Sequence, residues 1–221
     1  MKNEVYFRQK KGEILEAAEY NREIYADIAA KLYGLLRGKV IDFGNGRVIN
    51  YDTMRIDKLI CVDITNAKKP LTSQKIDFIY GDFYSFELPT DLHCVMAQFL
   101  LHHLSDDQRL FESLGRVRAA LGHEGEFIVV EMLLPRYLEL LQGALRPLVY
   151  RLLGWIGKPT FRFFSLESLS SMLRRTGFGS IETHFVDIGR RVAPAPVLFP
   201  GLKIQGKLYP LKCVIVEVSG R

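Results

Sequence analysis

Five short apolar runs, each ending at a glycine or a polar residue, restrict the fold of this sequence more than any other feature. They occupy residues 39–43, 58–63, 76–80, 92–97 and 126–131. Because each run is apolar on both faces, it is typical of a strand buried in a parallel sheet. Helical patterns lie between some of the runs, most clearly at 105–121, with Ser105 as the expected N-cap and a turn at 122–125. This alternation predicts a parallel sheet with helices on both faces.

Further patterns flank the five runs. Residues 13–37 have apolar positions at helical spacing, and Gly38 is expected to end that helix. The tail shows a helix at 165–176, then strands at 181–188 and 212–219. Two closing strands favour an antiparallel edge. The sequence therefore predicts an α/β protein with a doubly wound, mostly parallel seven-stranded sheet and an antiparallel edge strand.

Composition and charge narrow the class of protein. The 221 residues are 48% hydrophobic and 25% charged, which suits one folded domain (1–221) rather than a disordered chain. The net charge of +5 comes from scattered Lys and Arg, so we expect no nucleic-acid partner. We find no signal peptide in residues 1–20 and no apolar stretch of about 18 residues, so we expect no transmembrane segment. The three cysteines form no C-x-x-C pair, which favours a cytoplasmic protein without a structural metal.

Glycines and carboxylates follow the first two runs. The first run leads through Asp42 into Gly44, Asn45 and Gly46, and the second ends at Asp63. Glycine lets the backbone approach a ligand closely. A carboxylate at the next strand end can accept both hydroxyl protons of a ribose, in charge-assisted bonds of roughly 1.5–3 kcal/mol each. The plainer alternatives are a simple strand-to-loop turn and a helix N-cap.

Polar and aromatic residues also follow the later runs. Asp82 could accept the exocyclic amine of adenine while Phe83 stacks on its ring, although Gly-Asp also suits a surface turn. Gln98 ends the fourth run. A histidine or carboxylate near these ends could act as a general base, unless it only packs against the next helix. The candidate bases are His102, His103 and Glu131.

Taken in order, these motifs resemble the class I S-adenosylmethionine (SAM)-dependent methyltransferase family, in its small-molecule branch, over about residues 25–188. VIDFGNG is similar to its glycine-rich motif, LICVDIT to its acidic strand, YGDFYSFELP to its adenine segment and QFLLHHLSD to its fourth strand. The resemblance implies that SAM is the cofactor. It also implies a role for each motif: the first would line the methionine part of SAM, Asp63 would hold the ribose, Asp82 and Phe83 would flank the adenine, and Gln98 would lie near the sulfonium.

Two departures from the family pattern concern the first motif. Val48 stands where the family usually has a third glycine, and residues 47–55 are a poor helix. We therefore expect the helix after the first strand to be shortened or replaced by a loop. The two remaining glycines are the ones nearest the ligand, so a retained fold with weak SAM binding is a secondary hypothesis.

Residues 136–155 form an amphipathic helix pattern, with a kink expected at Pro147. We predict a lid insertion at about 133–164 over a small aromatic or lipophilic acceptor, and an N-terminal helical cap at 1–37. Phe161, Phe163 and Phe164, with Tyr6 and Phe7, would line the mouth. An ordinary surface helix is equally consistent, and peripheral membrane contact stays open. The chain could be a monomer or a homodimer.

Three rival functions stay open. A nicotinamide-dependent oxidoreductase would use the same glycines and Asp63, but Ile49 stands near the place of its third glycine. An RNA methyltransferase would need an Asn/Asp-Pro-Pro-aromatic motif or an added RNA-binding module, and we see neither. A catalytically silent binding protein of the same fold is the third rival.

Overall fold

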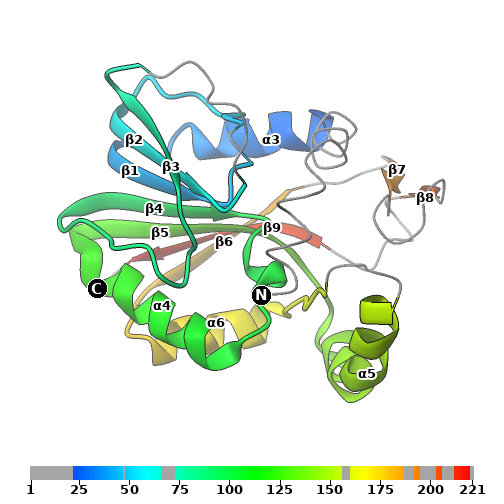
Figure 1. Cartoon of the computed structure of the whole chain (residues 1–221). Coiled ribbons are helices and arrows are strands. Elements are labelled where there is room, and N and C mark those ends of the chain that lie inside the picture. The colour runs from blue at the N-terminus through cyan, green and yellow to red at the C-terminus, as the bar shows by residue number, and fades with distance from the viewer. Residues whose placement is uncertain are drawn as a thin grey trace.

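The computed structural model describes residues 22–46, 48–65, 73–155, 160–186, 192–194, 203–205 and 212–219. A seven-stranded sheet with the order β3-β2-β1-β4-β5-β9-β6 forms its centre (Figure 1). All neighbours pair in parallel except β9, which is antiparallel to β5 and β6. The predicted sheet is confirmed, with the antiparallel strand lying one position in from the edge. The strands are β1 (Gly38–Phe43), β2 (Ile56–Asp63), β3 (Ile76–Tyr80), β4 (Leu92–Gln98), β5 (Leu121–Leu133), β6 (Ile181–Val186) and β9 (Lys212–Ser219).

Helices cover both faces of the sheet, as the alternating pattern predicts. Helix α3 (Arg22–Leu32) lies on one face, while α4 (Asp107–Ala120) and α6 (Leu166–Arg175) lie on the other (Figure 1). Alternate strand residues point to each side, so two apolar cores form. One includes Ile28 and Met96, and the other includes Phe43 and Phe127.

Three predicted helix and strand ends are wrong. The first helix ends at Leu32, and Gly38 instead begins β1 with φ +67°, while residues 13–21 lie outside the described residues. Asp106, not Ser105, caps α4, because its carboxylate accepts the Arg109 N–H at 3.0 Å. The expected turn at 122–125 belongs to β5: a Cβ on Gly125 would lie 2.7 Å from the Leu92 carbonyl, so glycine permits close strand contact there.

The connecting segments complete the description. Residues 48–55 contain no helix, as the weak helical pattern after the first strand predicts. The remaining elements are η1 (Leu101–His103), α5 (Arg136–Trp155) and a small hairpin of β7 (Val192–Pro194) and β8 (Lys203–Gln205). Helix α5 is confirmed as a helix, with Pro147 inside it. Within the described ranges, no helix has the length and apolar character needed to cross a membrane.

Candidate functional site

The candidate site lies where the carboxyl ends of the central strands meet. From β1 the sheet continues through β2 and β3 on one side and through β4 and β5 on the other. Ligands of open α/β sheets bind at such a switch point. In the ladder, Asp42 pairs with Cys61 of β2 and Met96 of β4, and Asp63 is the last residue of β2. The predicted residues of the first four motifs therefore come from neighbouring strand ends.

The glycine loop after β1 is tied directly to Asp63. One oxygen of that carboxylate accepts the Gly46 N–H at 2.9 Å, and the other accepts the N–H and the hydroxyl of Thr65 at 2.7 and 2.6 Å. Gly44 and Gly46 have φ of +73° and +59°, a region that favours glycine. The loop is thus folded around Asp63, and binding of a ribose by this carboxylate stays a prediction.

Asp42 is a fully buried carboxylate. Its Oδ2 accepts the Tyr51 hydroxyl at 2.7 Å. Its Oδ1 accepts no hydrogen bond of normal geometry from the described residues. Burial raises the pKa of Asp42 to about 7; the charge of Asp63 adds to the shift, while Tyr51 and the Asn45 amide oppose it. A buried carboxylate oxygen of this kind suits an ammonium donor such as the amino group of SAM, so the residues fit the predicted cofactor.

The end of β4 adds an amide pair. Gln98, 7% exposed, faces Asn50, with amide N–O distances of 3.4 and 3.5 Å. The next residue, Phe99, has φ of +48°, a strained conformation that is often found at functional sites. Asn50, Tyr51 and Phe99 were not predicted from the sequence as residues of this site. Only the weak helical pattern around Asn50 marked that segment as unusual.

In the segment after β3, the adenine contact of Asp82 stays a prediction, whereas Phe83 packs into the core. The Gly81 N–H donates to the Asp63 carbonyl at 3.0 Å, which holds this segment next to β2. The Asp82 carboxylate accepts the Tyr84 N–H at 3.0 Å. Phe83, by contrast, is only 6% exposed and meets Phe43 edge to face at 5.0 Å in the core. Its ring is therefore committed to packing, and we drop it as the adenine-stacking group.

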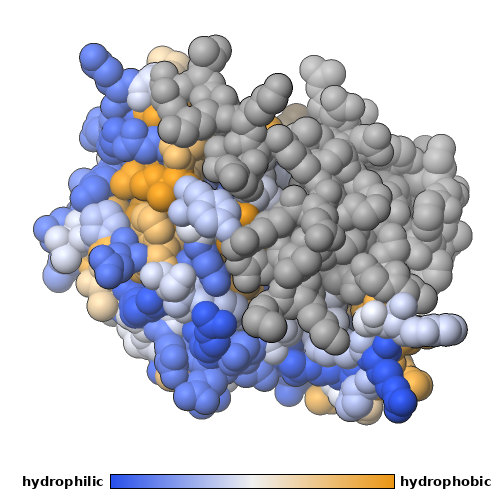
Figure 2. All heavy atoms as spheres, in the orientation of Figure 1, coloured by the Kyte–Doolittle hydropathy of each residue, from blue (hydrophilic) through white to orange (hydrophobic). Residues whose placement is uncertain are grey.

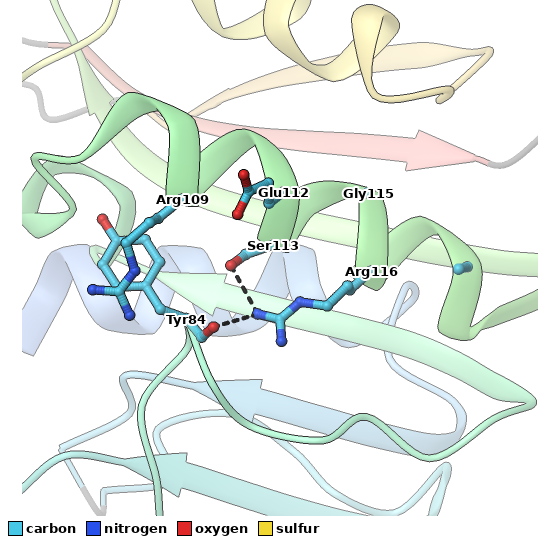
Figure 3. Close-up of a pocket in the computed structure, with 7 residues that line it drawn as sticks. Tyr84, Arg109, Glu112, Ser113, Gly115 and Arg116 are labelled. Carbon is cyan, nitrogen blue, oxygen red and sulfur yellow. Dashed lines mark hydrogen bonds between the residues drawn. The ribbon is translucent and has the colours of Figure 1, made fainter.

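A hollow of about 430 Å³ lies beside the same segment, on helix α4 (Figure 3). Arg116 reaches across it and donates to the Tyr84 carbonyl at 2.6 Å and to the Ser113 hydroxyl at 2.9 Å. The Arg109 guanidinium lies 4.3 Å from the centre of the Tyr84 ring. These contacts fasten the segment after Asp82 to α4, so we assign this hollow a structural role.

His102 and Glu131 form a buried pair at the ends of β4 and β5. One Glu131 oxygen lies 2.8 Å from His102 Nδ1, and the other accepts the Leu101 N–H at 2.8 Å. The Phe163 ring stacks on the imidazole at 5.4 Å. Glu131 therefore fixes the orientation of the ring and leaves Nε2 for other chemistry, the arrangement of an oriented general base.

His103 is less suited to the same task. Burial, together with the nearby His102, lowers the pKa of His103 well below its ordinary value. Phe161 lies 5.2 Å from its ring, while Phe164 is buried in the core. Of the predicted aromatic lining, Phe161 and Phe163 lie beside the histidines. Tyr6 and Phe7 fall outside the described residues.

Helix α5, the expected lid, has its leucine-rich face on the outside of the molecule. Helix α5 lies in the predicted 133–164 insertion, but its apolar face points away from the body. Leu141, Leu145, Leu148 and Leu152 are all more than 40% exposed. On the opposite side of the helix, Gln142, Arg146 and Tyr150 donate to backbone oxygens of the body, and Leu153 is buried beside them. The four exposed leucines therefore do not line the candidate site.

Solved structures define the class of this fold. A chain from the complex of a Haloferax volcanii methyltransferase with its activator Trm112 aligns with a TM-score of 0.66 at 15% identity, covering 97% of this chain and 96% of that one. The DhpI–SAH complex gives 0.64 at 14%, covering 100% and 97%. A SAM-dependent methyltransferase from Thermotoga maritima gives 0.60 at 16%, covering 97% and 98%. At these identities the likeness is one of fold, and that fold is the Rossmann-like methyltransferase fold.

The sequence comparisons agree with this class. An uncharacterized methyltransferase of Bacillus cereus is 25% identical over 91 residues, 38% of this chain. The match spans 43% of that relative, so the chain covers less than half its length. Residues 41–145 match the family model of the O-methyltransferase domain. The sequence and structure comparisons thus both point to SAM-dependent methyltransferases, with the family-model match covering residues 41–145 of the 221.

Proposed function

We propose that the chain transfers a methyl group from SAM to an oxygen of a small aromatic or lipophilic acceptor. The observation that carries this proposal is the pair of sites on neighbouring strand ends: the carboxylates of β1 and β2, and the His102–Glu131 pair beside Phe163. The match to an O-methyltransferase domain supports oxygen as the methylated atom. The free thiols of the three buried cysteines support a cytoplasmic location.

The cofactor side would be held by residues of the first three motifs. Asp42 would accept the amino group of SAM, Asp63 the ribose hydroxyls and Asp82 the adenine amine. Gln98 would lie near the sulfonium, and the backbone of Gly44, Asn45 and Gly46 would pass close to the methionine part. SAM supplies the activated methyl group. Because the displacement is in line, these residues contribute mainly alignment and exclusion of water.

The acceptor side would be formed by His102 and its neighbours. Phe163 and Phe161 would contact an aromatic acceptor, and His102 Nε2 would take the hydroxyl proton as the new C–O bond forms. Glu131 would hold the ring and stabilise the imidazolium that results. The lowered pKa of His103 leaves that residue a packing role.

Calorimetry with SAM and its demethylated product tests the cofactor site. We expect wild-type protein to bind both, and Asp63→Asn to bind SAM at least roughly tenfold more weakly, a loss of about 1.4 kcal/mol. Asp57→Asn, an exposed carboxylate on the same strand, is the matched control and should bind normally. Unchanged affinity in Asp63→Asn would remove the ribose assignment, and no heat from either ligand with folded wild-type protein would refute SAM binding.

A further inference from the structure

Helix α5 is bound to the body through its polar side. Gln142 makes two bonds with the Phe163 backbone, at 2.9 and 3.1 Å, and the Tyr150 hydroxyl donates to the Phe161 carbonyl at 3.2 Å. Arg146 donates to the Ser105 carbonyl at 2.9 Å. A surface helix normally turns its apolar stripe toward the core. Helix α5 has the opposite orientation.

A buried acid anchors the start of the helix in this orientation. Glu139 pairs with Arg136 at 2.7 Å and accepts the Ser168 hydroxyl of α6 at 2.7 Å. Burial by itself raises the pKa of Glu139, but hydrogen bonds from Ser165, Ser168 and Arg136 outweigh it and lower the pKa overall. Rotating the helix to bury its leucines would break this ionised cluster, so the orientation is fixed by specific bonds.

The outward face is a continuous apolar stripe. Its exposed fractions run from 45% at Leu145 to 85% at Trp155. Figure 2 shows hydrophobic side chains on the surface in the lower right of the view, where α5 lies. At 1.5 Å per residue, a stripe of this length spans roughly 27 Å. The members of the stripe are Tyr137, Leu141, Leu145, Leu148, Leu152 and Trp155.

Among the charged residues of α5, Arg151 borders this stripe, while Arg136 and Arg146 are bonded to Glu139 and to the body of the protein. Glu139 is the one acid of α5, and it is buried. Arg151 borders the stripe and, with Leu148, Leu152 and Trp155, lines a hollow at the end of the helix. A second copy of α5 would bring only further cations to this face, whereas an anionic lipid surface supplies the missing negative charge. Tyr and Trp near the two ends of the stripe also suit the boundary between water and lipid.

We propose that α5 is an interfacial helix that docks the protein on an anionic bilayer surface, with the stripe among the lipid chains and Arg151 at the headgroups. This inference stands apart from the proposed methyl transfer, because it rests on contacts of α5 alone. Docking would set Phe161 and Phe163, whose backbone α5 holds, close to the membrane.

Trp155 makes the proposal directly measurable, because it is the single tryptophan of the chain. We expect phosphatidylcholine vesicles containing phosphatidylglycerol to shift the Trp155 emission of the full-length protein to shorter wavelength and to protect it from acrylamide. Vesicles of phosphatidylcholine alone should have a much smaller effect, and high salt should weaken binding. Vesicle co-sedimentation gives an independent measure.

Two pairs of variants test the named residues. Leu141→Glu with Leu148→Glu should weaken partitioning by roughly tenfold or more, while Met54→Glu, at a still more exposed apolar residue on the loop before β2, should not. Arg151→Gln should weaken binding to anionic vesicles more than Arg174→Gln on α6. Circular dichroism checks that each variant folds. An unchanged Trp155 spectrum with anionic vesicles would overturn the proposal. It would also be overturned if the protein bound no lipid but self-associated, and if Leu148→Glu abolished that self-association.

Discussion

At the scale of single residues, the two carboxylates of β1 and β2 differ in how their charge is stabilised. Asp63 accepts three hydrogen bonds, whereas among the described residues the Tyr51 hydroxyl is the one donor with normal geometry at Asp42. Asp63 therefore holds the loop whether or not a ligand is bound. Asp42 has an oxygen to offer, and its protonation depends on pH in the neutral range.

The raised pKa of Asp42 predicts a pH-dependent affinity for SAM. Because the pKa is about 7, the carboxyl must lose a proton below that pH before it pairs with an ammonium group. Affinity should therefore rise between about pH 6 and pH 8 and then level off. Asp42→Asn should bind more weakly at pH 8 and show a flatter profile, which titration calorimetry at several pH values can measure.

The raised pKa of Asp42 has the opposite effect on folding stability, which should decrease as pH rises. A pKa raised in the folded state means that the folded chain holds the proton more tightly than the unfolded chain. The contribution of Asp42 to stability is thus greatest in acid and is lost as pH rises through about 7. In urea melts, Asp42→Asn should gain stability relative to wild type as pH increases; an equal difference at all pH values would contradict the assignment.

His102 supports a second prediction at this scale. His102→Gln should lower the rate of methyl transfer to a phenolic acceptor by roughly 10²- to 10⁴-fold and leave SAM affinity unchanged. Glu131→Gln should lower the rate and change its pH profile, because Glu131 acts through the ring it holds. The exposed His123→Gln is the control. Wild-type rates in His102→Gln would exclude its role as the base.

These residues show what sequence could and could not provide. Asp42, Asp63 and Gln98 were predictable because each ends or nearly ends an apolar run. Tyr51 and Asn50 were not, since they come from a loop whose path depends on tertiary contacts. The role of Phe83 could not be decided from sequence, because an aromatic residue after Gly-Asp is suited both to stacking on a ligand and to packing in the core.

At the scale of elements, apolar runs predicted strands well and their ends less well. All five runs are strands, since burial on both faces leaves a clear signal. The predicted N-cap at Ser105 and the predicted turn at 122–125 were wrong, because capping and turn patterns are only local signals. The start of α4 is set by another local cap, at Asp106, whereas Gly125 of β5 lies close to the Leu92 carbonyl of the neighbouring strand.

The glycine loop after β1 allows a matched comparison. A Cβ on Gly44 would meet the Leu100 side chain at 3.0 Å at φ +73°, whereas one on Gly46 would meet nothing within 4 Å at φ +59°. Both alanine variants carry backbone strain of order 1–3 kcal/mol. We expect Gly44→Ala to lose more free energy of unfolding than Gly46→Ala in urea titrations; equal losses would show that the Leu100 contact is easily relieved.

At the scale of the whole molecule, the mostly parallel seven-stranded sheet was predictable and the orientation of α5 was not. A helical pattern reveals an apolar face, but not whether that face turns inward. The hydrogen bonds of Glu139 and Gln142 determine the orientation of α5. Their partners, Ser168 and Phe163, come from later in the chain. The helix was correctly located, the outward direction of its exposed leucines was not foreseen, and its role as a lid stays a prediction.

A ligand that bridges several strand ends should stabilise the entire fold. SAM at about 100 times its Kd should add about 2.7 kcal/mol to the free energy of unfolding. For a chain of this size, that raises Tm by roughly 5–10 °C. Thermal melts with SAM, with its demethylated product and with NADH distinguish a methyltransferase from a nicotinamide-dependent oxidoreductase. For a methyltransferase, only the first two ligands should raise Tm. A shift with NADH alone would favour the oxidoreductase alternative.

The position of β9 between β5 and β6 has a consequence for biosynthesis. The strand β9 is translated after both of its neighbours in the sheet, and Val214, Val216 and Val218 enter the core only with it. Until residues 212–219 leave the ribosome, β5 and β6 expose unpaired edges that invite aggregation. A nascent chain stalled before that point should depend on chaperones to remain in solution.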